Sequence, residues 1–196
     1  MSISAAVYCG SRYGANPRFA AIARDLGTQL AARGYRLVYG GGKVGLMGEV
    51  ADAVIAGGGE VVGVIPTELV DREIAHAGLT RLEVVDTMRE RKARMEALAD
   101  VFFVLPGGIG TLEELTEVLT LQQLGRVCGP VVLVDVDGYW QPFVEFLKSA
   151  VAAGFVDGKY VDALIVTHAV DDIFAALFRW QAPGDKWGDS RADSTL

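Results

Sequence analysis

The sequence predicts a single α/β domain, a doubly wound parallel sheet with helices on both faces. Short apolar runs of strand length alternate along the chain with longer segments whose apolar residues recur at helical spacing. The runs are apolar almost throughout, which is typical of parallel strands buried on both faces. Glycine is abundant, with 24 in 196 residues, and many glycines directly follow these runs. We assign the domain to residues 1–181.

The strands are expected where a β-compatible apolar run meets a turn residue. Pro66 closes the third run, and the fifth run is entirely apolar and therefore fits a central strand. The expected strands are residues 5–9, 36–39, 61–65, 82–85, 101–105, 131–134 and 164–166.

The first helix is expected to start at Pro17, which suits a first helical turn, and to stop at Gly34. The other helices are expected at residues 46–55, 88–99, 112–124, 139–153 and 170–180. Residues 68–78 are ambiguous and include a possible short helix. From Ala182 onward apolar periodicity ends, so residues 182–196 are expected to form a loose tail.

The composition excludes several classes of protein. There are 18 Lys and Arg against 25 Asp and Glu, a net charge of −7, which argues against a general nucleic-acid binder. One locally positive pocket for a phosphate-bearing small molecule remains compatible with this charge. No apolar run reaches membrane-spanning length and the N-terminus lacks the basic start of a signal peptide, so we expect a cytoplasmic protein.

Three further features concern partners and metals. A hydrophobic content of 51% is high for a soluble monomer and indicates a buried subunit interface. Cys9 and Cys128 lie beside strand-like runs and are expected to be buried, without a disulfide. With only His76 and His168, the chain has no zinc-site spacing, and no metal is expected.

Ligands of a doubly wound sheet bind beyond the carboxyl ends of the strands. The first segment at that edge is GGGKVGLMG at residues 40–48, which contains GxGxxG. A dinucleotide site also needs an acidic residue after the next strand, which instead ends in Ile65 and Pro66. Val44 after Lys43 excludes a P-loop. A ligand loop and a tight packing turn both remain open.

The second segment is PGGIGTLEE at residues 106–114. Its glycines allow backbone N–H groups to converge on an anion at a helix N-terminus, and Thr111 adds a hydroxyl. Alternatively, Thr111 and Glu114 fit a capping box, in which the glutamate bonds back to the first residue of the helix. The capping box explains Glu114 but not the preceding glycines, so we favour a phosphate cradle.

The third segment is MRERK at residues 88–92. Arg91 and Lys92 stand near a helix N-terminus, where cations oppose the helix dipole unless an anion lies nearby. A solvated charged face would explain the segment equally well on its own. Because the glycine loop is expected at the same edge, we favour a functional role.

Together these segments resemble the Lonely Guy family, also described as lysine decarboxylase-like. The family motifs PGGxGTxxE, MxxRK and GGGxxGLMG match residues 106–114, 88–92 and 40–48, and the opening CGS matches residues 9–11. The resemblance implies a Rossmann-like fold and, at this length, a homodimer. It also implies hydrolysis of cytokinin riboside 5′-monophosphates, which are N6-substituted AMP molecules, to a free cytokinin base and ribose 5-phosphate.

The resemblance implies Arg91 and Glu114 as the catalytic pair. Substrate-binding positions are expected at Ser11, Gly42, Glu73, Met88, Lys92, Gly107, Gly108, Ile109, Gly110, Thr111, Leu112, Glu113 and Thr120. The chain departs from the family at Arg89, often His, and at Leu121, often Trp, and we expect Leu121 to alter base preference.

No cofactor is expected. A pyridoxal decarboxylase needs a Schiff-base lysine, and no lysine of this chain has a context that singles it out. Two alternatives stay open: a broader AMP or nucleoside-monophosphate hydrolase, and a nucleotide-binding protein without turnover on the same fold.

Overall fold

The computed structural model describes residues 2–70 and 75–187. Within these residues, seven strands form one sheet in the order β4-β3-β2-β1-β5-β6-β7, and all pairs are parallel. The predicted doubly wound α/β fold is therefore confirmed. The strands are β1 (Ser4–Tyr8), β2 (Arg36–Tyr39), β3 (Val61–Pro66), β4 (Arg81–Val85), β5 (Val101–Val104), β6 (Val131–Val134) and β7 (Ile165–Thr167).

The helices follow the expected alternation with two additions. One is the single 3-10 turn η1 (Thr67–Leu69), which lies partly in the ambiguous segment, while residues 71–74 fall outside the described residues. The other is α6, too short for a helical periodicity to show, whose start is capped by Asp157 accepting from the Lys159 N–H at 3.1 Å. The α-helices are α1 (Arg18–Ala32), α2 (Gly45–Ala56), α3 (Met88–Leu98), α4 (Ile109–Gln123), α5 (Gln141–Ala152), α6 (Gly158–Asp162) and α7 (Val170–Arg179).

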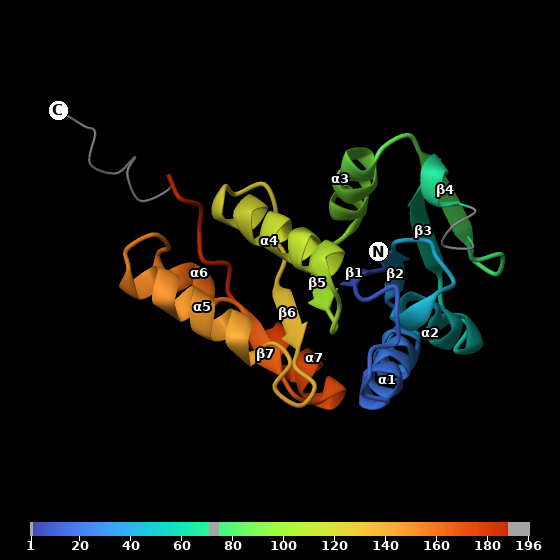
Figure 1. Ribbon diagram of the computed structural model, residues 1–196, viewed down its shortest axis with the longest axis horizontal. Helices are drawn as coiled ribbons and strands as arrows, with labels where there is room; N and C mark the ends of the chain where they lie inside the picture. The colour runs from blue at the N-terminus through green and yellow to red at the C-terminus, as the bar shows by residue number, and fades with distance from the viewer. Residues whose placement is uncertain (1, 71–74, 188–196) are drawn as a thin grey trace.

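Helices cover both faces of the sheet (Figure 1). α1, α2 and α7 pack on one face, and α3, α4 and α5 pack on the other. Side chains of each strand alternate between the faces, so Val7 points into the first core and Tyr8 into the second. Each central strand is thus buried on both sides, as its apolar sequence predicts.

The strand order reverses at β1. The chain builds β2, β3 and β4 outward on one side and then returns to place β5 on the other side of β1, with Tyr8 paired to Val104. The connections that leave β1 and β5 therefore run to opposite faces. A crevice opens between them at the carboxyl ends, the usual ligand site of such sheets.

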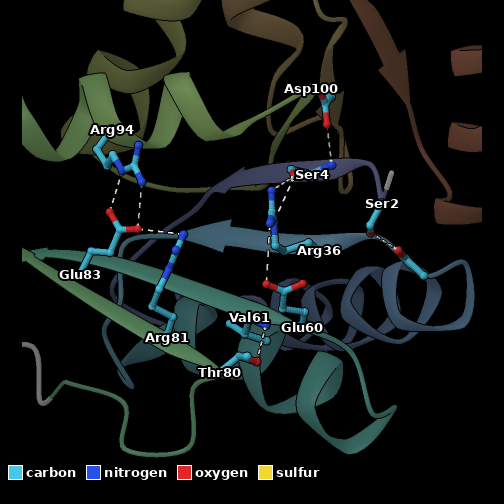
Figure 2. A network of polar contacts seen from close by, with 11 residues as sticks. Ser2, Ser4, Arg36, Glu60, Val61, Thr80, Arg81, Glu83, Arg94 and Asp100 are labelled. Atoms are coloured by element: carbon cyan, nitrogen blue, oxygen red, sulfur yellow. Dashed lines mark hydrogen bonds and ion pairs between the residues drawn. The ribbon is translucent and has the colours of Figure 1, made fainter.

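Polar contacts join neighbouring strands at the opposite edge of the sheet, where the strands begin (Figure 2). The Ser4 N–H donates to the Asp100 carboxylate at 2.8 Å, joining β1 to the residue before β5. Arg36 on β2 donates to the Ser4 hydroxyl at 2.7 Å and lies 3.7 Å from Glu60. These contacts hold the register of the central strands at the end away from the crevice.

A second group of contacts in Figure 2 fixes α3 to β4. Glu83 on β4 lies between Arg81 at 2.8 Å and Arg94 of α3, whose Nε donates at 2.6 Å and Nη2 at 3.2 Å. The hydrogen bond from Arg94 lowers the pKa of Glu83. A two-point arginine–carboxylate contact restrains orientation as well as distance, so it sets how α3 lies on the sheet.

Two expectations about the periphery can be compared with the structure. Cys9 is buried, but Cys128 is exposed, because it lies in the turn between α4 and β6 rather than in the strand. Of the expected tail 182–196, residues 188–196 lie outside the described residues, and the Lys186 N–H donates to the Gln123 carbonyl at 2.8 Å. No helix in the described ranges is both long and apolar enough to cross a membrane.

Candidate active site

A cavity of about 450 Å³ lies at the carboxyl ends of β1 and β5, where the strand order reverses. Its walls come from the segments after β1, β5 and β6 and from the first turns of α2, α3 and α4. The expected site residues that line it are Ser11, Met88, Arg91, Gly107, Gly108, Ile109, Gly110, Thr111, Glu113 and Glu114.

The remaining expected residues have other positions. Gly42 forms an isolated bridge with Ala75, and the Thr120 hydroxyl donates to the Thr116 carbonyl at 2.7 Å. Gly42, Lys92, Leu112, Thr120 and Leu121 are not among the described residues that line the cavity. Glu73 lies outside the described residues.

The capping-box interpretation of Thr111 and Glu114 is wrong. α4 begins at Ile109 with Gly108 as its N-cap, and its first hydrogen bond runs from the Leu112 N–H to the Gly108 carbonyl at 3.0 Å. Thr111 is therefore inside the first turn. The sequence predicts that this helix begins at residue 112, after Gly110. It begins earlier because glycine is tolerated in a first turn, whose N–H groups do not yet take part in the helical hydrogen bonds.

The glycines of this turn serve two purposes. A Cβ at Gly107 would come within 2.1 Å of the Thr111 hydroxyl and 2.9 Å of the Gly10 nitrogen, so packing requires a glycine there. At Gly108 and Gly110 a Cβ would meet no atom of the described residues within 4 Å. The empty space beside the first N–H groups of α4 is therefore available to a ligand. An anion there would meet the positive end of the helix dipole.

Arg91 is buried, with 6% of its surface exposed, at the start of α3. The Thr87 hydroxyl caps this helix by accepting from the Glu90 N–H at 3.2 Å. Arg91 Nη2 donates to the Gly40 carbonyl at 3.4 Å. A Cβ at Gly40 would lie 1.8 Å from this nitrogen, so the glycine leaves the space that the guanidinium fills.

The GGG loop after β2 thus has a packing role. Gly45 has φ 56°, and a Cβ there would lie 2.4 Å from the Arg12 nitrogen. These contacts favour the tight-turn interpretation of the GxGxxG pattern over a dinucleotide loop. The loop still contributes to the cavity through Leu46 and Met47, which follow it in α2.

Glu114 and Arg91 line the same cavity and share a buried neighbour, Tyr8. Burial raises the pKa of the Tyr8 phenol well above its ordinary value. The charges of Glu114, Glu96 and Glu117 raise it further, and Arg91 opposes them. Tyr8 therefore remains a neutral phenol beside the catalytic candidates at physiological pH.

Lys92 joins α3 to α4 instead of lining the cavity. Its Nζ lies 2.6 Å from Glu113 Oε1 and 2.7 Å from Glu117 Oε2. Burial lowers the pKa of Lys92, but its hydrogen bonds to these two glutamates outweigh burial and leave the pKa raised. Glu96 lies in the same interface, where burial and the charge of Glu117 raise its pKa to about 7 against the opposing effect of Lys92.

Several lining residues were absent from the expected set. They are Cys9, Gly10, Arg12, Tyr13, Gly14, Phe19, Leu46, Met47, Pro106 and Tyr139. Tyr139 follows β6 at the same edge of the sheet. Because ligands of such sheets bind beyond the carboxyl ends of the strands, a search of residues 135–139 for site residues would have found it.

The strand order and the position of the cavity define a class, the doubly wound α/β proteins with a site at the switch point of the sheet. Within that class, the chain belongs to the family described as "Possible lysine decarboxylase", whose model matches residues 47–177.

The chain is similar to curated enzymes of plants and bacteria. The cytokinin riboside 5′-monophosphate phosphoribohydrolase LOG of Oryza sativa subsp. japonica is 49% identical over 150 residues, which cover 76% of this chain and 62% of the rice protein. The chain thus spans less than two thirds of the length of that relative. The Rhodococcoides fascians enzyme of the same name, without the suffix LOG, is 41% identical, over 89% of this chain and 88% of that protein.

Solved structures share the fold. The molybdenum cofactor carrier protein of Chlamydomonas reinhardtii superposes with a TM-score of 0.70 at 22% identity, covering 91% of this chain and 98% of that one. The molybdenum cofactor binding protein of Rippkaea orientalis gives 0.67 at 19% identity, covering 89% and 94%. At these identities the likeness concerns the fold alone.

The decarboxylase description of the family implies a pyridoxal cofactor, which the site does not fit. Such a cofactor needs a lysine for its Schiff base. No lysine is among the described residues that line the cavity, and Lys92 is held between two glutamates.

Glu96 should make the stability of the protein depend on pH. Its pKa is about 7 in the folded chain and near 4.5 when unfolded, so folding loses stability as pH rises from about 4.5 to about 7. We expect Glu96→Gln to be more stable relative to the wild type at pH 8 than at pH 5. The difference should be about 1 kcal/mol or less, since water screens this half-buried group.

Urea unfolding at the two pH values measures this difference. Glu60→Gln, at the amino-terminal edge, is the matched control, and loss of its contact with Arg36 should displace stability by the same amount at both pH values. An equal displacement of Glu96→Gln at both pH values would contradict titration of Glu96 in this range.

Proposed function

We propose that this chain hydrolyses the N-glycosidic bond of a cytokinin riboside 5′-monophosphate, giving a free base and ribose 5-phosphate. The observation on which this depends is that one cavity contains Arg91, Glu114 and an open glycine turn at the start of α4. A nucleoside monophosphate needs both parts, an anion site for its phosphate and reactive groups near its glycosidic bond. The names of the relatives in rice and Rhodococcoides fascians support the same activity.

The phosphate is assigned to the first turn of α4. Space beside Gly108 and Gly110 admits an anion to the N–H groups that precede the helical hydrogen bonds. The hydroxyl of Thr111, which also lines the cavity, adds a donor. Binding energy from the phosphate would hold the distant glycosidic bond in place for reaction, so nucleosides without the phosphate should react poorly.

The reaction itself is assigned to Glu114 and Arg91. Cleavage of an N-glycosidic bond passes through a sugar with oxocarbenium character. Glu114 would stabilise this cation or take a proton from the attacking water, and Arg91 would orient Glu114 and contact the nucleotide. The C1′–N9 bond breaks, the water oxygen bonds to C1′, and the departing base takes up a proton.

Apolar side chains in the cavity favour an apolar base substituent. Leu46, Met47 and Met88 line it, and the Met88 sulfur lies 3.7 Å from Arg91 Nη1. Methionine side chains are flexible and polarizable and adapt to irregular apolar groups. This lining supports an N6-substituted adenine over plain AMP.

We also propose that the protein is a homodimer. α5 has no fully buried residue in the single chain, and its Phe146 is 65% exposed beside a groove of about 150 Å³ between α4, α5 and α6. A second copy covering this surface would account for the hydrophobic content of 51%.

Glu114→Gln should remove turnover without unfolding the protein. Loss of a general base or of the negative charge costs about 10²–10⁴-fold in rate, while Gln keeps the shape of the side chain. We would measure release of ribose 5-phosphate from isopentenyladenosine monophosphate and from AMP, with melting curves as the test of folding. Glu60→Gln makes the same chemical change at the other edge of the sheet and should keep wild-type rates.

The outcomes separate the candidate functions. Faster release from isopentenyladenosine monophosphate supports the proposal, and faster release from AMP would indicate a broader nucleotide hydrolase. If neither nucleotide is cleaved but AMP raises the melting temperature, the chain is a binding protein and the hydrolase proposal fails.

Gly40→Ala should impair the site through Arg91. The new methyl group would occupy the position of the guanidinium, 1.8 Å from Nη2, so Arg91 must move. A displacement of about 1 Å in a reacting group can cost about 100-fold in rate, and we expect a loss of this order in the same assay. Gly158→Ala, whose Cβ would meet Val151 at an ordinary 3.7 Å, is the control. Wild-type turnover by Gly40→Ala would show that Arg91 needs no fixed position.

The dimer is tested by mass in solution. Sedimentation should give twice the chain mass of 20.9 kDa for the wild type and a lower mass for Phe146→Glu. Phe178→Glu introduces the same charge at an exposed residue of α7 and should remain dimeric. A monomeric wild type would contradict the proposal.

A further inference from the structure

Tyr139 follows β6 and lines the cavity, although neither the motifs nor the catalytic assignment includes it. Its hydroxyl donates to the carbonyl oxygen of Gly107, the residue that opens the glycine turn. We propose that Tyr139 is a positioning residue that holds the phosphate-binding turn in its competent conformation. The phosphate assignment rests on the proposed function.

The geometry of the turn explains why this hydrogen bond matters. An anion at the start of α4 is attracted by N–H groups and repelled by carbonyl oxygens. The hydroxyl of Tyr139 donates a hydrogen bond to the Gly107 carbonyl and thereby fixes the orientation of the peptide that joins Gly107 to Gly108. The neighbouring Pro106 carbonyl is held from the other side, where it accepts from the Gly10 N–H at 3.1 Å.

The Tyr139 ring is itself held in place. It packs edge-on against Phe19, with ring centroids 5.5 Å apart, and against Trp140 at 5.1 Å. The buried Asp135 fixes the backbone beside it, since its carboxylate accepts from the Trp140 N–H at 2.8 Å. A hydroxyl on a restrained ring holds its acceptor more firmly than one on a freely rotating side chain.

The same loop reaches the opposite wall of the cavity. Asp137 accepts from Asn16 Nδ2 at 2.8 Å and pairs with Arg18 at the start of α1. Asn16 and Arg18 follow the segment Ser11–Gly14, which lines the cavity. The connection between β6 and α5 thus ties both walls of the phosphate end, Tyr139 to the glycine turn and Asp137 to the segment after β1.

Tyr139→Phe removes the hydroxyl and keeps the ring packing. We expect KM for isopentenyladenosine monophosphate to rise about fivefold, the effect of one net hydrogen bond, with kcat changed less than twofold. The Kd of ribose 5-phosphate, measured by calorimetry, should rise by the same factor. Tyr35→Phe is the matched control, because Tyr35 packs on Phe174 away from the cavity and loses the same hydroxyl.

Calorimetry separates this proposal from the proposed function. If the wild type binds ribose 5-phosphate without cleaving nucleotides and Tyr139→Phe binds it more weakly, Tyr139 positions the turn although the hydrolase assignment fails. An unchanged Kd in Tyr139→Phe overturns the role of Tyr139, whether or not the wild type is active. A loss in kcat alone, or a melting temperature that falls by more than a few degrees, also overturns it.

Discussion

Three loops of the site meet at the backbone of Gly10, and the arrangement of the cavity depends on this junction. The Gly10 N–H donates to the Pro106 carbonyl after β5 at 3.1 Å, and the Gly10 carbonyl accepts from the Leu46 N–H at the start of α2 at 3.0 Å. A Cβ at Gly10 would lie 3.1 Å from the Arg12 carbonyl. Segments that follow β1, β2 and β5 are thereby held together by main-chain contacts. The position of the anion cradle relative to Arg91 follows from this junction.

Ion pairs between α3 and α4 lie next to the cavity. Arg91 faces the cavity from α3, and one residue further along the same helix Lys92 turns to Glu113 and Glu117 of α4. The ion pairs fix α3 and α4 to each other, and with them the spacing of Arg91 and Glu114. Glu96 belongs to the same interface, so its charge state bears on the contact between the two helices that supply the catalytic candidates.

The sequence was sufficient for the sheet, because apolar runs and glycine breaks are local signals. It was also sufficient for the location of the cavity, since ligands of a doubly wound sheet bind beyond the carboxyl ends of its strands. It failed where a local pattern competed with tertiary contacts. The Thr111–Glu114 spacing satisfies a capping box, but tertiary contacts around Gly107 start the helix at Ile109. The contact between Gly40 and Arg91 joins residues 51 positions apart in sequence, and no local sequence pattern predicts it.

Gly108 and Gly110 differ from the other glycines of the site in the space around them. A Cβ at Gly10, Gly40 or Gly107 would press on neighbouring atoms of the described protein, whereas the space at Gly108 and Gly110 is open. The fold would accept a methyl group at either of these two positions. Damage there would leave expression and melting temperature normal, so a search for impaired variants by thermal stability would pass over the two residues on which ligand entry most directly depends.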